Sequence, residues 1–372
     1  MNNLSKGNRM VRIGIIGCGY WGINYVRVFN ELADVTVVRV CDTNEERLVM
    51  MHRKFPYVFP TKRMEELLAD EEVDAVVVST EASTHYRITK ECLLQDKHVL
   101  VEKPLTTTIE EGEELVQIAG ERERMLMVGH TFLYNPAILK IKESLSSEDI
   151  GSIYYLQATR THLGLIRSDV NAIWDLAPHD ISIFSYLLDE QPLWVSAIGG
   201  NFLNGRPDVG FITLGYPHNI LGNIHVSWIN SNKVRELSVV GSKKRIVFDD
   251  LNSMERVRIF EKGAALTGEA DTFGEFQLQL RDGDIISPRI DSYEPLKSQC
   301  SHFISCVSNG HFPLTDGKNG LDVVRVMCAI NLSLKKFGAP VSVLKCGVPE
   351  EVLSLTASNG ALNSKQSEGV LH

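Results

Sequence analysis

The sequence predicts two domains: a doubly wound α/β domain with a parallel sheet, then an α+β domain with a largely antiparallel, open sheet. From Val11 to about Gly129, short apolar runs alternate with helix-period segments, as in strands covered by helices on both faces. After His130 the strand-like segments alternate polar and apolar residues instead. The 372 residues also exceed the roughly 250–300 that one hydrophobic core supports. We expect domains at 1–130 and 131–357, and a polar, flexible tail at 358–372.

In the first domain, β-branched apolar runs predict strands, and apolar positions with a period of 3.6 predict the helices between them. The predicted strands are Val11–Ile16, Val35–Cys41, Tyr57–Phe59, Val73–Ser79, His98–Val101 and Met125–Val128. Predicted helices include Met64–Ala69, Thr84–Leu94 and Ile109–Glu121. In such open sheets, ligands bind at the carboxyl ends of the strands.

In the second domain, alternating segments separated by turn residues predict a mainly antiparallel sheet. The predicted strands are Ile153–Thr161, Val195–Phe202, Val209–Leu214, Ile220–Trp228 and Val234–Val240. A helix is expected near Asn135–Leu145, and two later helices, at Leu296–Val307 and Gly320–Lys336, are expected to pack on this sheet or return to the first domain.

Composition favours small-molecule chemistry. A formal net charge of −9 and the absence of a long Lys/Arg run exclude a general nucleic-acid or membrane-surface binder. No apolar run approaches the roughly 20 residues that cross a bilayer, and residues 1–9 do not resemble a signal peptide. We therefore expect a cytoplasmic protein.

The seven cysteines do not predict disulfides or a metal site, because their number is odd and they lack paired or zinc-type spacing. Cys300, His302 and Cys306 are near one another, but they lie in an apolar segment of helical period. Burial is the preferred interpretation of these three, and no metal is expected.

The segment Gly17-Cys18-Gly19-Tyr20-Trp21-Gly22 follows the first strand and opens a helical pattern. Its glycines allow a tight turn, close approach of a pyrophosphate and close helix–strand packing. Asp42, at the end of the second strand and twenty residues beyond Gly22, is placed to bind the adenosine ribose hydroxyls. The pattern predicts a dinucleotide-binding Rossmann domain. Because Asp42 would repel a 2′-phosphate, NAD is expected rather than NADP.

Two segments supply candidate catalytic groups. Glu102-Lys103-Pro104 follows a strand at the carboxyl edge of the sheet, where Lys103 can polarise a hydroxyl beside a cofactor, or can be an ordinary surface lysine. Asp175 and His179 are four residues apart, so a helical backbone would place both on one side. Pro178 suits a first helical position, and Asp175 can alternatively be a plain helix cap.

With these motifs in this order, the chain resembles the Gfo/Idh/MocA oxidoreductases, named for glucose–fructose oxidoreductase and inositol dehydrogenase. The likeness spans most of the chain. It includes Ser79-Thr80, His85, His98 to Pro104, Val128-Gly129-His130, Tyr134-Asn135-Pro136 and Pro313 to Gly317.

The resemblance implies that Lys103 and His179 act at the substrate carbinol with Asp175 as their companion. It also implies a frequently cis Lys103–Pro104 bond, and a second domain whose open sheet face forms a homo-oligomer, a dimer or a tetramer. Together with the motif, it predicts a set of cofactor-binding residues: Gly17, Gly19, Tyr20, Trp21, Gly22, Asp42, Thr80, His85 and Glu102. His85 can alternatively be no more than the start of a helix.

The chain also departs from the family pattern. Many members have a glycine pair where Ile173-Trp174 stands, a glycine at Ala177 and an aspartate at Ser182. These changes leave the substrate's shape open. The segment Trp174–Asp180 resembles a subgroup associated with nucleotide-sugars, including UDP-N-acetylglucosaminuronate 3-dehydrogenases of surface polysaccharide synthesis.

We therefore expect an enzyme that moves a hydride between NAD and a sugar carbinol. The preferred substrate is a nucleotide-sugar. Reductases of keto-sugars or imines, dehydrogenases of free sugars or of cyclic polyols such as inositol, and a non-catalytic dinucleotide-binding sensor remain alternatives. The residues considered for substrate contact are Arg160, His162, Arg167, Tyr134 and Asn135, although Arg160, His162 and Arg167 can equally be solvated strand-end charges.

Overall fold

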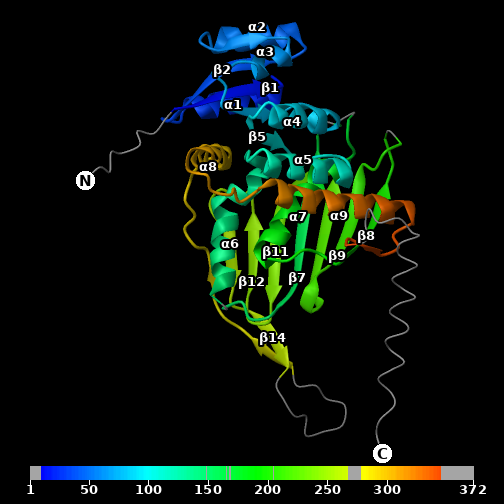
Figure 1. The fold of residues 1–372 in the computed structure, drawn as a ribbon. Helices are drawn as coiled ribbons and strands as arrows, with labels where there is room; N and C mark the ends of the chain where they lie inside the picture. The colour runs from blue at the N-terminus through cyan, green and yellow to red at the C-terminus, as the bar shows by residue number, and fades with distance from the viewer. Residues whose placement is uncertain are drawn as a thin grey trace, which may run out of the picture.

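The computed structural model describes residues 10–147, 149–164, 166, 169–203, 205–266 and 278–344. Two sheets organise these residues, one above the other in Figure 1. The predicted tail lies outside the described residues, as do Arg167 and Cys346.

The first sheet has six parallel strands in the order β3-β2-β1-β4-β5-β6, as a Rossmann sheet requires. Its strands are β1 Val11–Ile16, β2 Val35–Cys41, β3 Phe59–Thr61, β4 Ala75–Val78, β5 His98–Glu102 and β6 Leu126–Gly129. The helices between them are α1 Tyr20–Asn30, α2 Glu45–Lys54, α3 Met64–Leu68, α4 His85–Leu94 and α5 Ile109–Glu121, with a 3₁₀ turn η1 at Ala82–Thr84. β4 and most of β5 are fully buried, because helices cover both faces.

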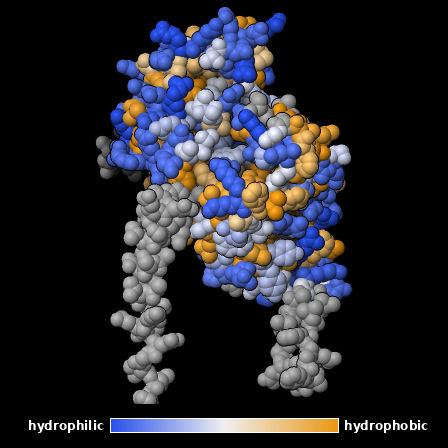
Figure 2. Space-filling model, turned by 90° about the vertical axis from the view of Figure 1, so that its right-hand side faces the viewer, coloured by the Kyte–Doolittle hydropathy of each residue, from blue (hydrophilic) through white to orange (hydrophobic). Residues whose placement is uncertain are grey.

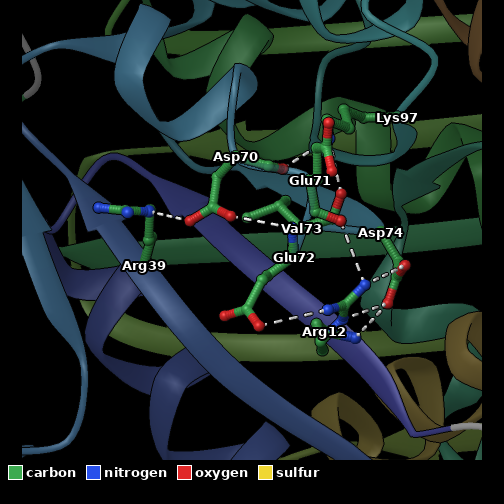
Figure 3. A network of polar contacts seen from close by, with 8 residues as sticks. All are labelled: Arg12, Arg39, Asp70, Glu71, Glu72, Val73, Asp74 and Lys97. Carbon is green, nitrogen blue, oxygen red and sulfur yellow. Dashed lines mark hydrogen bonds and ion pairs between the residues drawn. The ribbon is translucent and has the colours of Figure 1, made fainter.

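A polar network fixes the amino-terminal edge of this sheet (Figure 3). The loop 70–74 enters β4 and receives one cation from each of three neighbouring segments. Arg12 of β1 bonds to the Asp74 carboxylate with Nε 3.1 Å from Oδ2, and Arg39 of β2 pairs with Asp70. Lys97 is buried just before β5, and its Nζ donates to the carbonyls of Asp70 at 2.9 Å and Val73 at 2.7 Å. These charged side chains lie at the amino-terminal edge of the sheet. They therefore do not occupy the opposite, carboxyl edge, where ligands bind in such sheets.

The second sheet has nine strands in the order β16-β13-β12-β11-β7-β10-β9-β8-β17, antiparallel except for the parallel pair β7–β10. Its strands are β7 Ile153–Leu163, β8 Trp194–Gly200, β9 Val209–Gly215, β10 Leu221–Ser227, β11 Ile229–Gly241, β12 Arg245–Asp249, β13 Val257–Phe260, β16 Ile285–Ile286 and β17 Val341–Ser342. A separate hairpin pairs β14 Gly263–Leu266 with β15 Leu278–Arg281.

Helices lie against one face of the second sheet, in front of it in Figure 1. They are α6 Pro136–Ser146, α7 Ala172–Leu188 and α9 Gly317–Lys335; the turn η2 Thr131–Tyr134 precedes α6, and the turn η3 Pro217–Asn219 joins β9 to β10. α8 Pro295–Asn309 packs on α1, and α9 contacts both α5 and β8. The two late helices therefore join the domains, as one of the sequence alternatives proposed.

The fold class that the sequence predicts is confirmed, but some boundaries and elements differ. The third strand is Phe59–Thr61 rather than Tyr57–Phe59, and no strand from β12 to β17 was predicted. Cys300 and Cys306 are buried thiols, in agreement with the preferred interpretation.

The surface differs between the two domains. In Figure 2, hydrophilic residues dominate the upper part, whereas hydrophobic patches are more frequent on the lower part. No helix in the described ranges combines the length and apolar character that crossing a membrane requires.

Candidate active site

The loop between β1 and α1 has the shape that a pyrophosphate needs. Gly17 has a positive φ of 97°, and a side chain there would strike the Ser79 carbonyl oxygen at 2.6 Å. A side chain at Gly22 would lie 1.9 Å from the Gly17 carbonyl oxygen. At Gly19, by contrast, an added Cβ meets nothing within 4 Å. Gly17 and Gly22 therefore pack closely against the protein's own backbone, whereas the space in front of Gly19 is open. An anion can approach the amino end of α1 there.

Asp42, directly after β2, holds this loop. It is buried, and its carboxylate accepts hydrogen bonds from the backbone N–H groups of Cys18 at 2.7 Å and Asn44 at 2.8 Å. Arg47 lies at the rim, with Nη1 3.5 Å from Asp42 Oδ2. Tyr20 and Trp21 open α1 and remain largely exposed beside the loop. These residues fit a nicotinamide dinucleotide.

The loop after β5 is anchored on both sides. The Glu102 carboxylate is buried, accepts a hydrogen bond from the Tyr25 hydroxyl at 2.7 Å and receives the Lys103 backbone N–H at 3.2 Å. His85 is also buried, with Nδ1 2.7 Å from the Pro104 carbonyl and Nε2 3.2 Å from the Thr80 carbonyl. His85 therefore ties the loop after β4 to the loop that carries Lys103. The Lys103–Pro104 bond is cis, as the family resemblance implied.

The second motif lies inside a long helix rather than ahead of one. α7 begins at Ala172, and its amino-terminal cap is Asn171, whose side chain accepts from the Trp174 N–H. Two expectations are therefore wrong: Asp175 is not the cap, and Pro178 is within the helix rather than at its first position. The buried, apolar sequence on both sides of Pro178 keeps the helix continuous despite the missing donor. Asp175 and His179 do share one side of a helical backbone, as the spacing predicted.

Lys103 meets α7 across the domain boundary. Its Nζ donates to the Asp175 backbone carbonyl at 2.8 Å and to the carboxylate at 3.2 Å, and its side chain is only 8% exposed. The other carboxylate oxygen of Asp175 lies 3.3 Å from the indole nitrogen of Trp228. Asp175 therefore holds the lysine ammonium against α7 rather than letting it extend into solvent.

His179 lies beside this pair and is held neutral. Its Nδ1 is buried without a hydrogen-bond partner in the described part of the chain. Burial, and then the positive charge of Lys103 and Arg160, hold the pKa of His179 well below its usual range. The Phe132 ring packs edge-on against the imidazole, with centroids 4.9 Å apart. A neutral imidazole is the form that can accept a proton.

A second imidazole occupies the same region. His130 follows β6, on the strand next to the one that leads to Lys103, and only 1% of it is exposed. Neither of its ring nitrogens has a partner among the described residues. Burial and the charge of Lys103 lower its pKa to about 3. The sequence alone assigns His130 no role, because buried ring nitrogens without a partner are visible only in three dimensions.

The proposed substrate residues have varied positions. Arg160 is buried, with Nε 3.0 Å and Nη2 2.7 Å from the Asp180 carboxylate, so its donors serve an internal ion pair. Tyr134 is also buried, with its hydroxyl 3.5 Å from that of Thr315, which places it in the core rather than at the cleft. His162 is half-buried, two residues beyond Arg160.

Asn135 caps α6 and donates from Nδ2 to Asp250 at 3.4 Å. Asp250 in turn lies 3.5 Å from Arg235 Nη1. The sequence gives no signal for Arg235 or Asp250, because β11, which carries Arg235, and β12, which precedes Asp250, contain no recognisable motif.

The chain's likeness to known proteins matches this geometry. Residues 11–130 match the model described as "Oxidoreductase family, NAD-binding Rossmann fold", and residues 138–247 match the GFO/IDH/MocA C-terminal domain. The chain belongs to the Gfo/Idh/MocA oxidoreductase family. It is thus an NAD(P)-dependent oxidoreductase of a family that acts on CH–OH groups of sugars.

Several relatives of this family member cover nearly the whole chain. UDP-N-acetylglucosamine 3-dehydrogenase of Acidithiobacillus ferrooxidans is 25% identical over 88% of this chain and 98% of its own. Myo-inositol 2-dehydrogenase of Thermotoga maritima is 26% identical over 88% of this chain and 97% of its own. Among solved structures, the WlbA dehydrogenase of Bordetella pertussis, in complex with NADH and UDP-GlcNAcA, aligns with a TM-score of 0.74 at 21% identity, covering 90% and 99% of the two chains. This last likeness shows the fold alone.

Proposed function

We propose that this family member uses NAD to interconvert a carbinol and a ketone on the sugar of a nucleotide-sugar, as a 3-dehydrogenase does. The observation that carries the chemistry is the contact between Lys103 and Asp175, which brings the two motifs together beside His179. This convergence also argues against a sensor, because binding a dinucleotide alone would not require a buried ammonium next to a neutral imidazole.

In the proposed mechanism, the substrate hydroxyl lies between Lys103 and His179. The unburied ring nitrogen of His179 accepts the hydroxyl proton, and the ammonium of Lys103 stabilises the oxyanion that develops. A nicotinamide dinucleotide held by the loop Gly17–Gly22 and by Asp42 would supply the hydride acceptor for the same carbon, so that the carbinol would become a ketone. Asp175 keeps Lys103 in place, and Trp228 and Phe132 exclude water from one side. The imidazolium then returns its proton to solvent, and the reverse sequence reduces a ketone.

NAD is the proposed cofactor because Asp42 is a carboxylate directly after β2, the position from which an acidic side chain binds the adenosine ribose. A 2′-phosphate would meet this negative charge. Arg47, 3.5 Å from Asp42 and half exposed, is the feature that could offset that repulsion. The preference for NAD therefore needs a direct comparison of the two cofactors.

The nucleotide-sugar is proposed on the strength of one relative, the dehydrogenase of A. ferrooxidans, together with the segment Trp174–Asp180. The rival is a free cyclic polyol, which the relative from T. maritima favours at 26% identity, against 25% for the A. ferrooxidans relative. A role in polysaccharide synthesis and a cytoplasmic location remain part of the proposal.

The open face of the second sheet supports a homo-oligomer. On this face, Tyr155 of β7 stands opposite Leu221 of β10, Phe211 of β9 stands opposite Ile198 of β8, and all four side chains are exposed. Pairing with a second copy would bury them. Light scattering of wild-type protein and of Phe211→Arg would test this, since a monomeric wild type excludes it.

The deciding experiment identifies the cofactor and then the substrate. The nicotinamide that copurifies with the protein is released and identified. NADH absorbance is then followed with UDP-N-acetylglucosamine, its uronate, free sugars and myo-inositol. Turnover of a UDP-sugar is expected. Turnover of only a free polyol would reject the nucleotide-sugar, and bound cofactor without any turnover would favour the sensor.

A further inference from the structure

We propose that Arg235 binds an anionic group of the substrate, a sugar carboxylate or a diphosphate, and so selects charged sugars over neutral polyols. This inference rests on the proposed function and deepens it. It comes from the pairing of two arginines on neighbouring strands and from the very different way in which each is neutralised.

The register of the second sheet places Arg235 on the catalytic side. On the antiparallel strands β7 and β11, Arg235 stands directly opposite Arg160. Directly opposed residues point to the same face of a sheet. Because Arg160 reaches Asp180 on α7, Arg235 also points to the face that α7 covers. The charge of Arg235 contributes to the low pKa of both His162 and His179, which agrees with a position at the cleft.

Two like charges opposite one another destabilise a sheet unless each is compensated. Arg160 is compensated fully, by a buried two-point ion pair with Asp180. Arg235 has one long contact, 3.5 Å from Nη1 to Asp250 Oδ2, and its side chain is 40% exposed. Within the described residues the structure gives its guanidinium no other hydrogen bond, so most of its donors are available to a ligand.

Asp250 does not cancel this donor capacity. Its other oxygen accepts from Asn135 Nδ2 at 3.4 Å, and its backbone N–H is bonded to the Arg235 carbonyl at 3.0 Å, so the carboxylate is held in place. An arginine fork forms its strongest contacts with a carboxylate or phosphate in the two-point geometry that Asp250 does not offer. Lys233, two residues earlier and exposed, adds a further positive charge. A neutral polyol would gain none of this charge assistance.

Binding to the NADH-loaded enzyme tests the inference separately from turnover. Calorimetry would compare UDP-N-acetylglucosamine (diphosphate), glucuronate (carboxylate), UDP-N-acetylglucosaminuronate (both) and myo-inositol (neutral). Wild type is expected to bind one of the anionic ligands best. Arg235→Met should lower the affinity for that ligand by about 10- to 100-fold, the range for a lost charged hydrogen bond, and leave the affinity for myo-inositol unchanged. The ligand whose affinity falls identifies which anionic group, carboxylate or diphosphate, Arg235 binds.

The matched control is Arg245→Met, another exposed strand arginine, which lies opposite Val240 on β11 and should change no affinity. Rising KM for the anionic substrate at unchanged kcat would agree with a binding role. If Arg235→Met loses NADH binding through misfolding, Asp250→Asn decides instead, since a freed Arg235 should tighten the anionic ligand relative to myo-inositol. Equal effects on the affinities of charged and neutral ligands, or no preference of wild type for anionic ligands, would overturn the inference. A lack of turnover, with the binding results as expected, would reject only the proposed reaction.

Discussion

Removing the cation of the buried Arg160–Asp180 pair should destabilise the second domain strongly. The side chains are only 7% and 3% exposed, and both carboxylate oxygens accept from the guanidinium, at 3.0 and 2.7 Å. In Arg160→Met the carboxylate would remain in a nearly water-free site without a partner. The expected loss in the free energy of unfolding is about 3–5 kcal/mol, the usual cost of an uncompensated buried charge. The guanidinium also covers the Phe132 ring at 4.4 Å, a contact worth about 0.5–2 kcal/mol.

Urea unfolding followed by tryptophan fluorescence is the suitable assay. Of the four tryptophans, Trp174, Trp194 and Trp228 lie in the second domain, so the signal reports mainly on that domain. The decisive comparison is the double variant Arg160→Met/Asp180→Leu. Because it removes both charges, it should be more stable than Arg160→Met alone. A single variant within about 1 kcal/mol of wild type, or a double variant that loses the sum of both single losses, would refute the reasoning.

Four further outcomes are expected. His179→Ala should lower kcat by about 10²–10⁴-fold with NADH affinity unchanged, measured by steady-state kinetics and fluorescence titration; a fully active variant would remove the proposed proton acceptor. Gly22→Ala should cost about 1–3 kcal/mol, because the new methyl group would collide with the Gly17 carbonyl at 1.9 Å, and NADH titration should show weaker binding. Asp42→Ala should reduce kcat/KM for NAD more than for NADP, and equal reductions would show that Asp42 does not discriminate between them. His130 takes up its proton at about pH 3 in the folded chain but near 6.5 when unfolded, so stability falls as the pH is lowered between these values. Between pH 7.5 and 5 wild type should lose about 2 kcal/mol more than His130→Phe in urea melts, and parallel losses in the two proteins would contradict this.

The sequence was a good guide wherever local rules dominate. The glycine loop and Asp42 could be assigned because a turn that must approach a phosphate admits only glycine, and the partner acid has a fixed spacing. Most strands of the first sheet were predicted because burial on both faces demands continuous apolar runs. The four-residue spacing of Asp175 and His179 likewise predicted a shared helix side.

Where long-range packing dominates, the sequence misled. Pro178 is tolerated within α7 because the surrounding helix is almost fully buried, so tertiary packing outweighs the missing hydrogen bond. The short strands β12, β13 and β16 carry little alternation, and their place at one edge of the sheet depends on pairing with β11 and with one another. Arg160 looked like a surface charge because its partner, Asp180, is twenty residues away on another element.

By itself the sequence determined a dinucleotide-binding sheet, a second domain and the chemical types of the reacting groups, since these depend on neighbouring residues and on backbone sterics. Only the tertiary structure decided which charged side chains are already paired within the protein and which can still bind a ligand. Lys103 is fixed by Asp175 and Arg160 by Asp180, whereas Arg235 keeps most of its donors. The reason is physical: the strength of a charge depends on its burial and on partners far along the chain, and neither quantity is written in local sequence.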